Sequence, residues 1–235
     1  MRRAVVPIST ALLALLLASC AGVPVAAPAA GSPAAGDSTR WEADIAAFER
    51  ADSGVRHAPG AVVFVGSSSI RMWDTLAADF PDVPTINRGF GGSRVRDSTW
   101  YADRIVTNYR PGAVVFYAGD NDLVEGRSPR QVRDDFVDFV AAVRRRVPDA
   151  RIGFIAIKPS PSRQALLPQM RQANELVRAY AQATPGVDYL DVFTPMLDAD
   201  GHPRRELFLA DMLHMNRLGY EIWIDVVGPW LRARR

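Results

Sequence analysis

The sequence predicts an α/β fold in which one parallel sheet lies between two layers of helices. Continuous apolar runs rich in β-branched residues alternate along the chain with longer stretches of helical periodicity. Such runs are typical of strands buried on both faces, which occur in parallel sheets. Strands that alternate with helices indicate βαβ units, and these predict a three-layer α/β/α sandwich.

Five segments are expected to form the strands of this sheet. Three of them are strongly apolar: 61–66 (AVVFVG), 113–119 (AVVFYAG) and 151–157 (RIGFIAI). Two shorter candidates are 83–87 (VPTIN) and 187–192 (VDYLDV). A five-stranded parallel sheet is therefore predicted.

Helical periodicity is clearest near the start of the domain, where Trp41, Ile45 and Phe48 recur at helical spacing. No internal repeat and no second linker are visible, so we expect a single domain over residues 41–235. The stretches predicted to be helical are 41–52, 69–79, 93–109, 129–147, 163–184 and 216–232.

The N-terminus is typical of a targeting segment. It begins MRR and continues with an apolar stretch over 4–18, which is too short to span a bilayer comfortably and fits a signal peptide. The stretch ends in LASC, which resembles the lipobox of bacterial lipoproteins. That resemblance implies a signal peptide over 1–19 and a lipid on Cys20; the alternative is an ordinary cleaved signal peptide in which Cys20 is incidental.

Residues 20–40 are expected to be a tether between the membrane and the domain. Residues 21–39 are almost entirely Ala, Pro, Gly, Ser and Val, which bury too little surface to offset the entropy of ordering. The predicted location is the bacterial cell envelope, with the lipid anchor as the membrane contact. Because Cys20 is the chain's one cysteine, intramolecular disulfides are excluded.

Composition excludes some functions. The chain is 48% hydrophobic and 23% charged with a formal net charge of +2, as in an ordinary soluble globular domain. Nucleic-acid binding would need a basic stripe interleaved with aromatic residues, and none is visible. We therefore expect no nucleic-acid partner.

Polar residues follow the predicted strands where an active site is expected. In open parallel sheets, ligands bind outside the carboxyl ends of the strands. Here 66–69 (GSSS), 87–93 (NRGFGGS) and 119–122 (GDND) each follow a strand, and 211–214 (DMLH) precedes the last helix. Each segment alone has a structural explanation, because serines cap helices, glycines make turns and Asx-rich loops stabilise themselves.

Together, these segments resemble the four blocks of the SGNH (GDSL) hydrolase family. The first is 66–68 (GSS), the second ends at Gly92, the third is 119–122 (GDND) and the fourth is 211–214 (DMLH). The family usually has aspartate where this chain has Ser67, a position that is not the triad acid. The resemblance implies a flavodoxin-like sheet with strand order 2-1-3-4-5.

The resemblance also implies roles for individual residues. Ser68 would be the nucleophile, His214 its base and Asp211 the acid that orients the base, since a serine hydroxyl is a poor nucleophile until a base takes its proton. The backbone N–H groups of Ser68 and Gly92 and the side-chain amide of Asn121 would form the oxyanion hole.

Several neighbouring residues are expected to be structural. Ser67 is predicted to be a turn residue and Ser69 to begin the next helix. Trp73 is predicted to be a core residue, with pocket lining as the alternative. His57 and His202 lie in Gly/Pro-containing loops and show no ligand cluster with the predicted base, so no metal is expected.

The predicted function is hydrolysis of carboxylic esters through an acyl-enzyme, with no metal or organic cofactor. A small-molecule or surface-presented ester is the expected substrate: a short-chain acyl or acetyl ester, an acetylated glycan or a lysophospholipid. Two alternatives stay open. One is an envelope acyltransferase with the same triad, and the other is a non-catalytic envelope binding protein that keeps only the fold.

Overall fold

The computed structural model describes residue 1 and residues 38–233. All of the predicted signal peptide (1–19) except its first residue, together with Cys20 and most of the predicted tether (20–40), lies outside the described residues, so these assignments stay predictions. Among the described residues, no helix has both the length and the apolar character needed to cross a membrane.

A five-stranded parallel sheet forms the centre of the domain, in the order β2-β1-β3-β4-β5. Both the strand number and the order confirm the prediction. The strands are β1 (Val62–Gly66), β2 (Thr85–Gly89), β3 (Ala113–Tyr117), β4 (Arg151–Ile155) and β5 (Val187–Leu190).

The second strand begins and ends two residues later than predicted, at Thr85–Gly89 instead of 83–87. Pro84 lies just outside it and contributes only its carbonyl, which accepts from Val62 N at 2.8 Å. At the other end, Gly89 pairs with Gly66. The strand β2 therefore ends beside the end of β1, where the polar segment after β1 begins.

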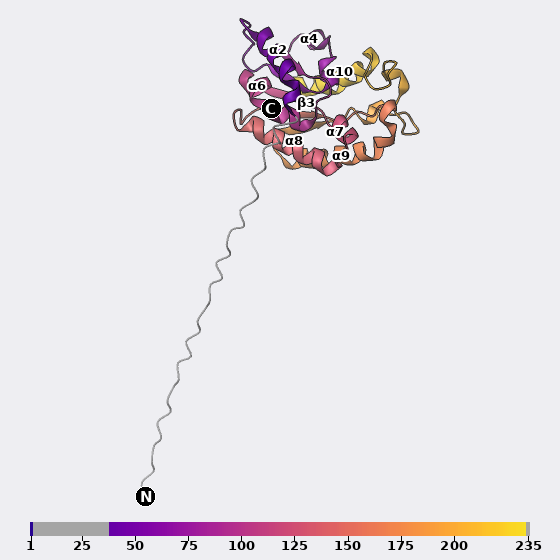
Figure 1. Cartoon of the computed structure of the whole chain (residues 1–235). Coiled ribbons are helices and arrows are strands. Elements are labelled where there is room, and N and C mark those ends of the chain that lie inside the picture. Colours follow the sequence, from indigo (N-terminus) through magenta and orange to yellow (C-terminus); the bar gives the residue numbers. More distant parts are fainter. Residues whose placement is uncertain (2–37, 234–235) are drawn as a thin grey trace. The chain divides into compact units, whose positions relative to one another are not determined.

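Helices cover both faces of the sheet (Figure 1). On β3, the neighbouring residues Phe116 and Tyr117 point to opposite faces, as strand geometry requires. The Phe116 ring contacts Phe139 of α8 (Pro129–Arg144) at a centroid distance of 4.4 Å, and the Tyr117 ring contacts Trp223 of α10 (Arg217–Arg232) at 4.8 Å. The α and 3-10 (η) helices are η1 (Thr39–Trp41), α2 (Glu42–Asp52), α3 (Ser68–Arg71), α4 (Leu76–Asp79), α5 (Val95–Trp100), α6 (Ala102–Ile105), η2 (Thr107–Tyr109), α7 (Asp120–Val124), α8 (Pro129–Arg144), η3 (Pro161–Leu166), α9 (Leu167–Ala183), η4 (Thr194–Met196), η5 (Arg205–Leu207) and α10 (Arg217–Arg232).

Several predicted helices are divided into shorter ones. The stretch 69–79 forms α3 and α4, 93–109 forms α5, α6 and η2, and 163–184 is divided between η3 and α9. In the first, Ile70 O accepts from Trp73 N at 3.1 Å and from the Asn87 side chain at 2.7 Å. This tight turn, held by a β2 side chain, ends the helix after one turn.

The short α-helix α7 was not predicted. The GDND segment, expected as a loop, begins α7 at Asp120. Gly119 precedes it with φ of +121°, a value that glycine adopts easily. Asp120 and Asp122 lie in the first turn of this helix.

Candidate active site

Ser68 is the first residue of α3 and directly follows the turn out of β1. This turn requires glycine at position 66, because its φ is +141° and a Cβ there would lie 1.8 Å from Tyr117 O. Ser67 N donates to the same Tyr117 carbonyl at 2.9 Å. The sheet therefore fixes the backbone that presents Ser68 at the carboxyl ends of the strands.

His214 and Asp211 lie beside this serine, as predicted. His214 Nε2 is 3.0 Å from Ser68 Oγ, and His214 Nδ1 is 2.6 Å from Asp211 Oδ2. The three side chains thus form a continuous hydrogen-bonded chain. Because one ring nitrogen contacts the carboxylate, the other is free to accept the serine proton.

A self-contained turn holds the Asp211–His214 pair. Asp211 Oδ1 accepts from the backbone N–H groups of Leu213 and His214, each at 2.9 Å, and Met212 has a left-handed φ of +56°. The hydrogen bond from the His214 side chain and those from the two backbone N–H groups lower the pKa of Asp211 to about 2. The carboxylate is therefore charged at any pH where the imidazole is neutral.

Gly92 lines the same pocket as Ser68 and His214. Its φ is +74°, and no atom lies within 4 Å of the position that a Cβ would occupy. A positive φ, rather than crowding within the protein, therefore favours glycine here. The adjacent Gly91 carbonyl accepts from Trp41 Nε1 at 2.9 Å, which ties this loop to the start of the domain.

Asn121 also reaches the pocket, from the first turn of α7. Its Nδ2 donates to Ser93 O at 3.0 Å, and its Oδ1 accepts from Arg163 at 2.9 Å. A side-chain amide nitrogen carries two hydrogens, of which Ser93 uses one. The other remains available to a bound ligand.

A buried charged network supports Asn121, and sequence reasoning missed it. Asp120 lies 3.3 Å from Lys158 Nζ and 2.9 Å from Arg163 Nη1, and Lys158 also donates to Tyr117 Oη at 3.2 Å. Burial opposes charge on Asp120, but the two cations outweigh it and lower the pKa of that carboxyl. Lys158 and Arg163 both follow β4, at the end of the sheet where sites collect, but nothing in the sequence indicates that their charges are paired and removed from solvent.

The five predicted site residues of the domain therefore converge on one place. The pocket there has a volume of about 480 Å³, and Leu213 is the one large apolar side chain among the described residues that line it. The full lining is Asp44, Ser68, Arg71, Gly91, Gly92, Asn121, Arg163, Leu213 and His214.

The residues beside the predicted nucleophile are buried. Ser67 and Ser69 are 1% and 2% exposed, and their hydroxyls have no hydrogen-bond partner among the described residues. Ser67 occupies the position before α3 but makes no side-chain cap, and α3 begins at Ser68, one residue earlier than predicted. Trp73 is 1% exposed and packs in the core, so the pocket-lining alternative is wrong.

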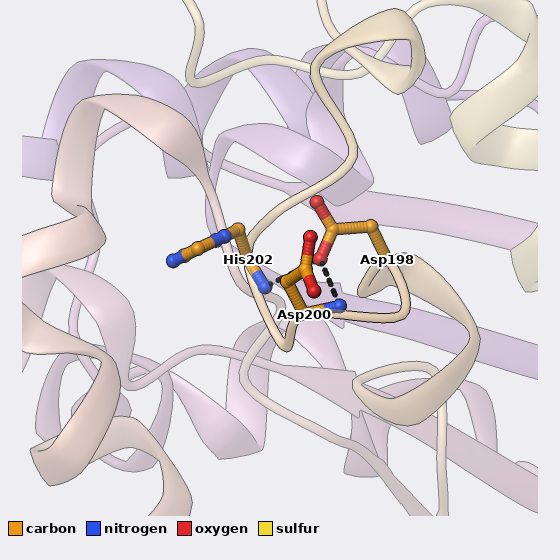
Figure 2. A group of neighbouring side chains, drawn as sticks. All are labelled: Asp198, Asp200 and His202. Atoms are coloured by element: carbon orange, nitrogen blue, oxygen red, sulfur yellow. Dashed lines mark hydrogen bonds between the residues drawn. The ribbon is translucent and has the colours of Figure 1, made fainter.

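One group of potential metal ligands is found among the described residues: Asp198, Asp200 and His202, all exposed (Figure 2). Asp198 Oδ1 already accepts from the backbone N–H groups of Asp200 at 3.0 Å and His202 at 2.8 Å. These bonds are typical of an aspartate that stabilises its own turn. A hollow of about 670 Å³ near this turn contains none of the predicted site residues.

Comparison with protein families agrees with this geometry. The model of the GDSL-like lipase/acylhydrolase family matches residues 53–222. The chain belongs to this family. It is therefore a hydrolase of the ester-cleaving type, and the matched region includes all the predicted site residues of the domain.

A curated relative supports the same family, and solved structures share the fold. Platelet-activating factor acetylhydrolase IB subunit alpha1 of Homo sapiens is 30% identical over 167 residues, which cover 68% of this chain and 70% of that protein. A GDSL-like lipase from Bacteroides thetaiotaomicron shares the fold with a TM-score of 0.66 and 19% identity, over 83% of this chain and 97% of that one. An acetyl esterase mutant crystallised with acetate gives a TM-score of 0.59 and 18% identity, over 73% and 96% of the two chains.

Proposed function

We propose that this GDSL-family hydrolase cleaves short-chain carboxylic esters through an acyl-enzyme on Ser68. The observation that carries the proposal is the chain of contacts from Ser68 Oγ through His214 to Asp211, with distances of 3.0 and 2.6 Å. A hydroxyl, a base and an orienting carboxylate in this order can activate a serine for acyl transfer.

In the first half of the reaction, Ser68 Oγ attacks the ester carbonyl while His214 Nε2 takes the hydroxyl proton. The tetrahedral intermediate collapses, the C–O bond to the alcohol breaks, and His214 returns the proton to the leaving oxygen. In the second half, water attacks the acyl-enzyme with the same base, which releases the acid and restores Ser68. Asp211 stabilises the imidazolium that forms in both halves.

The proposal assigns three donors to the oxyanion. The backbone N–H groups of Ser68 and Gly92 donate no hydrogen bond to any described residue, and Asn121 retains one amide hydrogen. Donors left unpaired at the edge of a pocket are suited to an oxygen that becomes charged in the transition state. No cofactor enters this mechanism.

The pocket lining favours a short acyl group. A long chain would contact few apolar side chains, since Leu213 is the one large apolar residue among the described lining residues. The relative named for platelet-activating factor is likewise called an acetylhydrolase. We therefore infer that acetyl esters, including acetylated glycans, are better substrates than lysophospholipids, whose acyl chains are long.

The test compares p-nitrophenyl acetate with p-nitrophenyl decanoate on the purified domain. We expect kcat/KM to be at least about tenfold higher for the acetate, because the longer chain gains little apolar contact. A higher kcat/KM for the decanoate would contradict the short-chain assignment. Repeating the acetate assay with an alcohol or sugar acceptor, and measuring how the acetyl group divides between water and acceptor, separates hydrolase from acyltransferase.

A further inference from the structure

Arg163 occupies a position at the pocket that the reaction outlined above does not use. It lies in η3, eight residues beyond the end of β4 at Ile155, and its side chain is 15% exposed. It lines the pocket together with Ser68, Asn121 and His214. Arginine side chains are mostly exposed to solvent unless they are paired, so the contacts that hold this one at the pocket bear on its role.

The contacts of Arg163 determine which way the Asn121 amide faces. A guanidinium can only donate hydrogen bonds, so the atom of Asn121 that faces it at 2.9 Å must be Oδ1. A backbone carbonyl can only accept, so the atom that faces Ser93 O at 3.0 Å must be Nδ2. Turning the amide over would replace both bonds with repulsive contacts, and this would remove the N–H group from its place at the pocket.

The same guanidinium connects Asn121 to the buried carboxylate beneath it. Arg163 Nη1 is 2.9 Å from Asp120 Oδ2, and Asp120 Oδ1 accepts from Asn121 N at 3.0 Å. Arg163 therefore braces both the backbone and the side chain of Asn121. Because arginine keeps its charge at every accessible pH, it also places a fixed positive charge behind the amide.

The segment that carries Arg163 also contacts the other half of the site. Ser162 N donates to Met212 O at 3.0 Å, in the turn between Asp211 and His214. Arg163 N donates in turn to Ser160 O at 3.0 Å. The position of the guanidinium is thus tied to the loop of the general base as well as to the oxyanion donor.

We propose that Arg163 is a positioning residue that holds the Asn121 amide with its free N–H toward the substrate carbonyl and strengthens that N–H as an oxyanion donor. This inference rests on the proposed function. Arg163 acts through Asn121 and does not itself transfer a proton. Its effect must therefore disappear when Asn121 is absent.

A double-mutant cycle tests the inference with p-nitrophenyl acetate as substrate. Arg163→Ala should lower kcat about 10–10²-fold with KM within about threefold, because a misplaced donor weakens transition-state binding more than ground-state binding. In an Asn121→Ala background, the same change should lower kcat by less than about threefold. The matched control is Arg127→Ala, which removes a partly buried arginine that is paired with Asp135 and is not among the pocket-lining residues; its kcat should stay within about twofold.

Arg163→Lys covers the case in which Arg163→Ala does not fold. Lysine keeps a positive charge beside Asp120 but has no planar fork to bridge Asp120 and Asn121, so we expect an approximately three- to tenfold loss of kcat, again absent in the Asn121→Ala background. Equal losses with and without Asn121, or an unchanged kcat, would overturn the inference alone. A folded wild-type protein that hydrolyses no ester would overturn the proposed function and the inference with it.

Discussion

The two halves of the active site are held in place by different means. Ser68, Gly92 and Asn121 follow the carboxyl ends of β1, β2 and β3, and a buried charge network braces Asn121 from below. The Asp211 and His214 pair lies in a loop between β5 and α10, where its side chains are 48% and 23% exposed. One half is therefore built into the sheet, and the other is a surface turn placed against it.

We infer from this difference that stability and activity are coupled on the sheet side of the site and separable in the exposed turn. Residues on the sheet side belong to buried networks, so changing them should affect both folding and turnover. Residues in the exposed turn make few buried contacts, so conservative changes there should affect turnover alone.

Asp211→Asn should give the largest loss of activity with almost no loss of stability. Asparagine keeps Oδ1, which accepts from the Leu213 and His214 backbone, but it replaces Oδ2 with a donor. That donor forces His214 into the tautomer that cannot accept the serine proton, so kcat should fall about 10⁴-fold. The melting temperature should stay within about 2 °C, as for other exposed substitutions. A variant that keeps more than about a tenth of wild-type kcat would show that Asp211 does not orient the base.

Asn121→Ala should lower both activity and stability. Loss of an oxyanion donor lowers kcat about 10²–10³-fold with KM nearly unchanged. Removing the amide also leaves Ser93 O and part of Arg163 without a partner, which costs about 1–3 kcal/mol. Steady-state kinetics and thermal melts on one preparation measure both effects. If the folded variant retains more than about a third of kcat, Asn121 is a turn residue and the three-donor hole is wrong.

Asp122, on the sheet side of the site, should make the free energy of unfolding depend on pH. Burial, together with the nearby Asp135 charge, raises the pKa of Asp122 to about 7 from an ordinary value of 3.8. Between those pH values the folded chain holds a proton that the unfolded chain releases. Its contribution to stability therefore falls as pH rises from about 4 to 7 and changes little above that.

Asp122→Asn should weaken this pH dependence, because the amide does not titrate. We compare the decrease in melting temperature between pH 5 and pH 8 in the two proteins. The decrease should be smaller in the variant than in the wild type, by at least about 3 °C. Asp134→Asn, which changes an exposed residue of α8, is the matched control and should behave like the wild type. Identical pH profiles for all three proteins would contradict a raised pKa at Asp122.

The smallest effects are expected at the serines beside the nucleophile. Ser67→Ala and Ser69→Ala remove buried hydroxyls that have no hydrogen-bond partner among the described residues. Each variant should keep at least about a third of wild-type kcat, and its stability should change by no more than about 1 kcal/mol. Loss of turnover in Ser69→Ala with activity retained in Ser68→Ala would show that the nucleophile has been placed one residue too early.

Much of this site could be predicted because its residues follow buried strands. The apolar runs 61–66 and 113–119 locate two strands, which the structure ends at Gly66 and Tyr117, and a parallel sheet brings the residues after them together. The Asp211–His214 pair could be found only by resemblance to known hydrolases, since no strand precedes it directly. The hydrogen bonds from the Leu213 and His214 backbone to Asp211 are nevertheless local to the turn.

The parts that could not be predicted depend on tertiary contacts. Nothing local indicates that the helix after Ser68 stops after one turn, because the Asn87 side chain of β2 is one of the contacts that hold that turn. The Lys158–Asp120–Arg163 network was missed because single charges after a strand look the same whether they are solvated or buried. Their pairing becomes visible only when β3 and β4 lie side by side.

The most direct test of the central claim is covalent labelling of the nucleophile. A fluorophosphonate probe reacts with a serine only when a base activates it and donors stabilise the charged adduct. We expect one probe mass per chain on the peptide that contains Ser67, Ser68 and Ser69, with fragmentation placing it on Ser68, and no label on Ser68→Ala. Labelling of another serine, or none on the folded wild-type domain, would contradict the account.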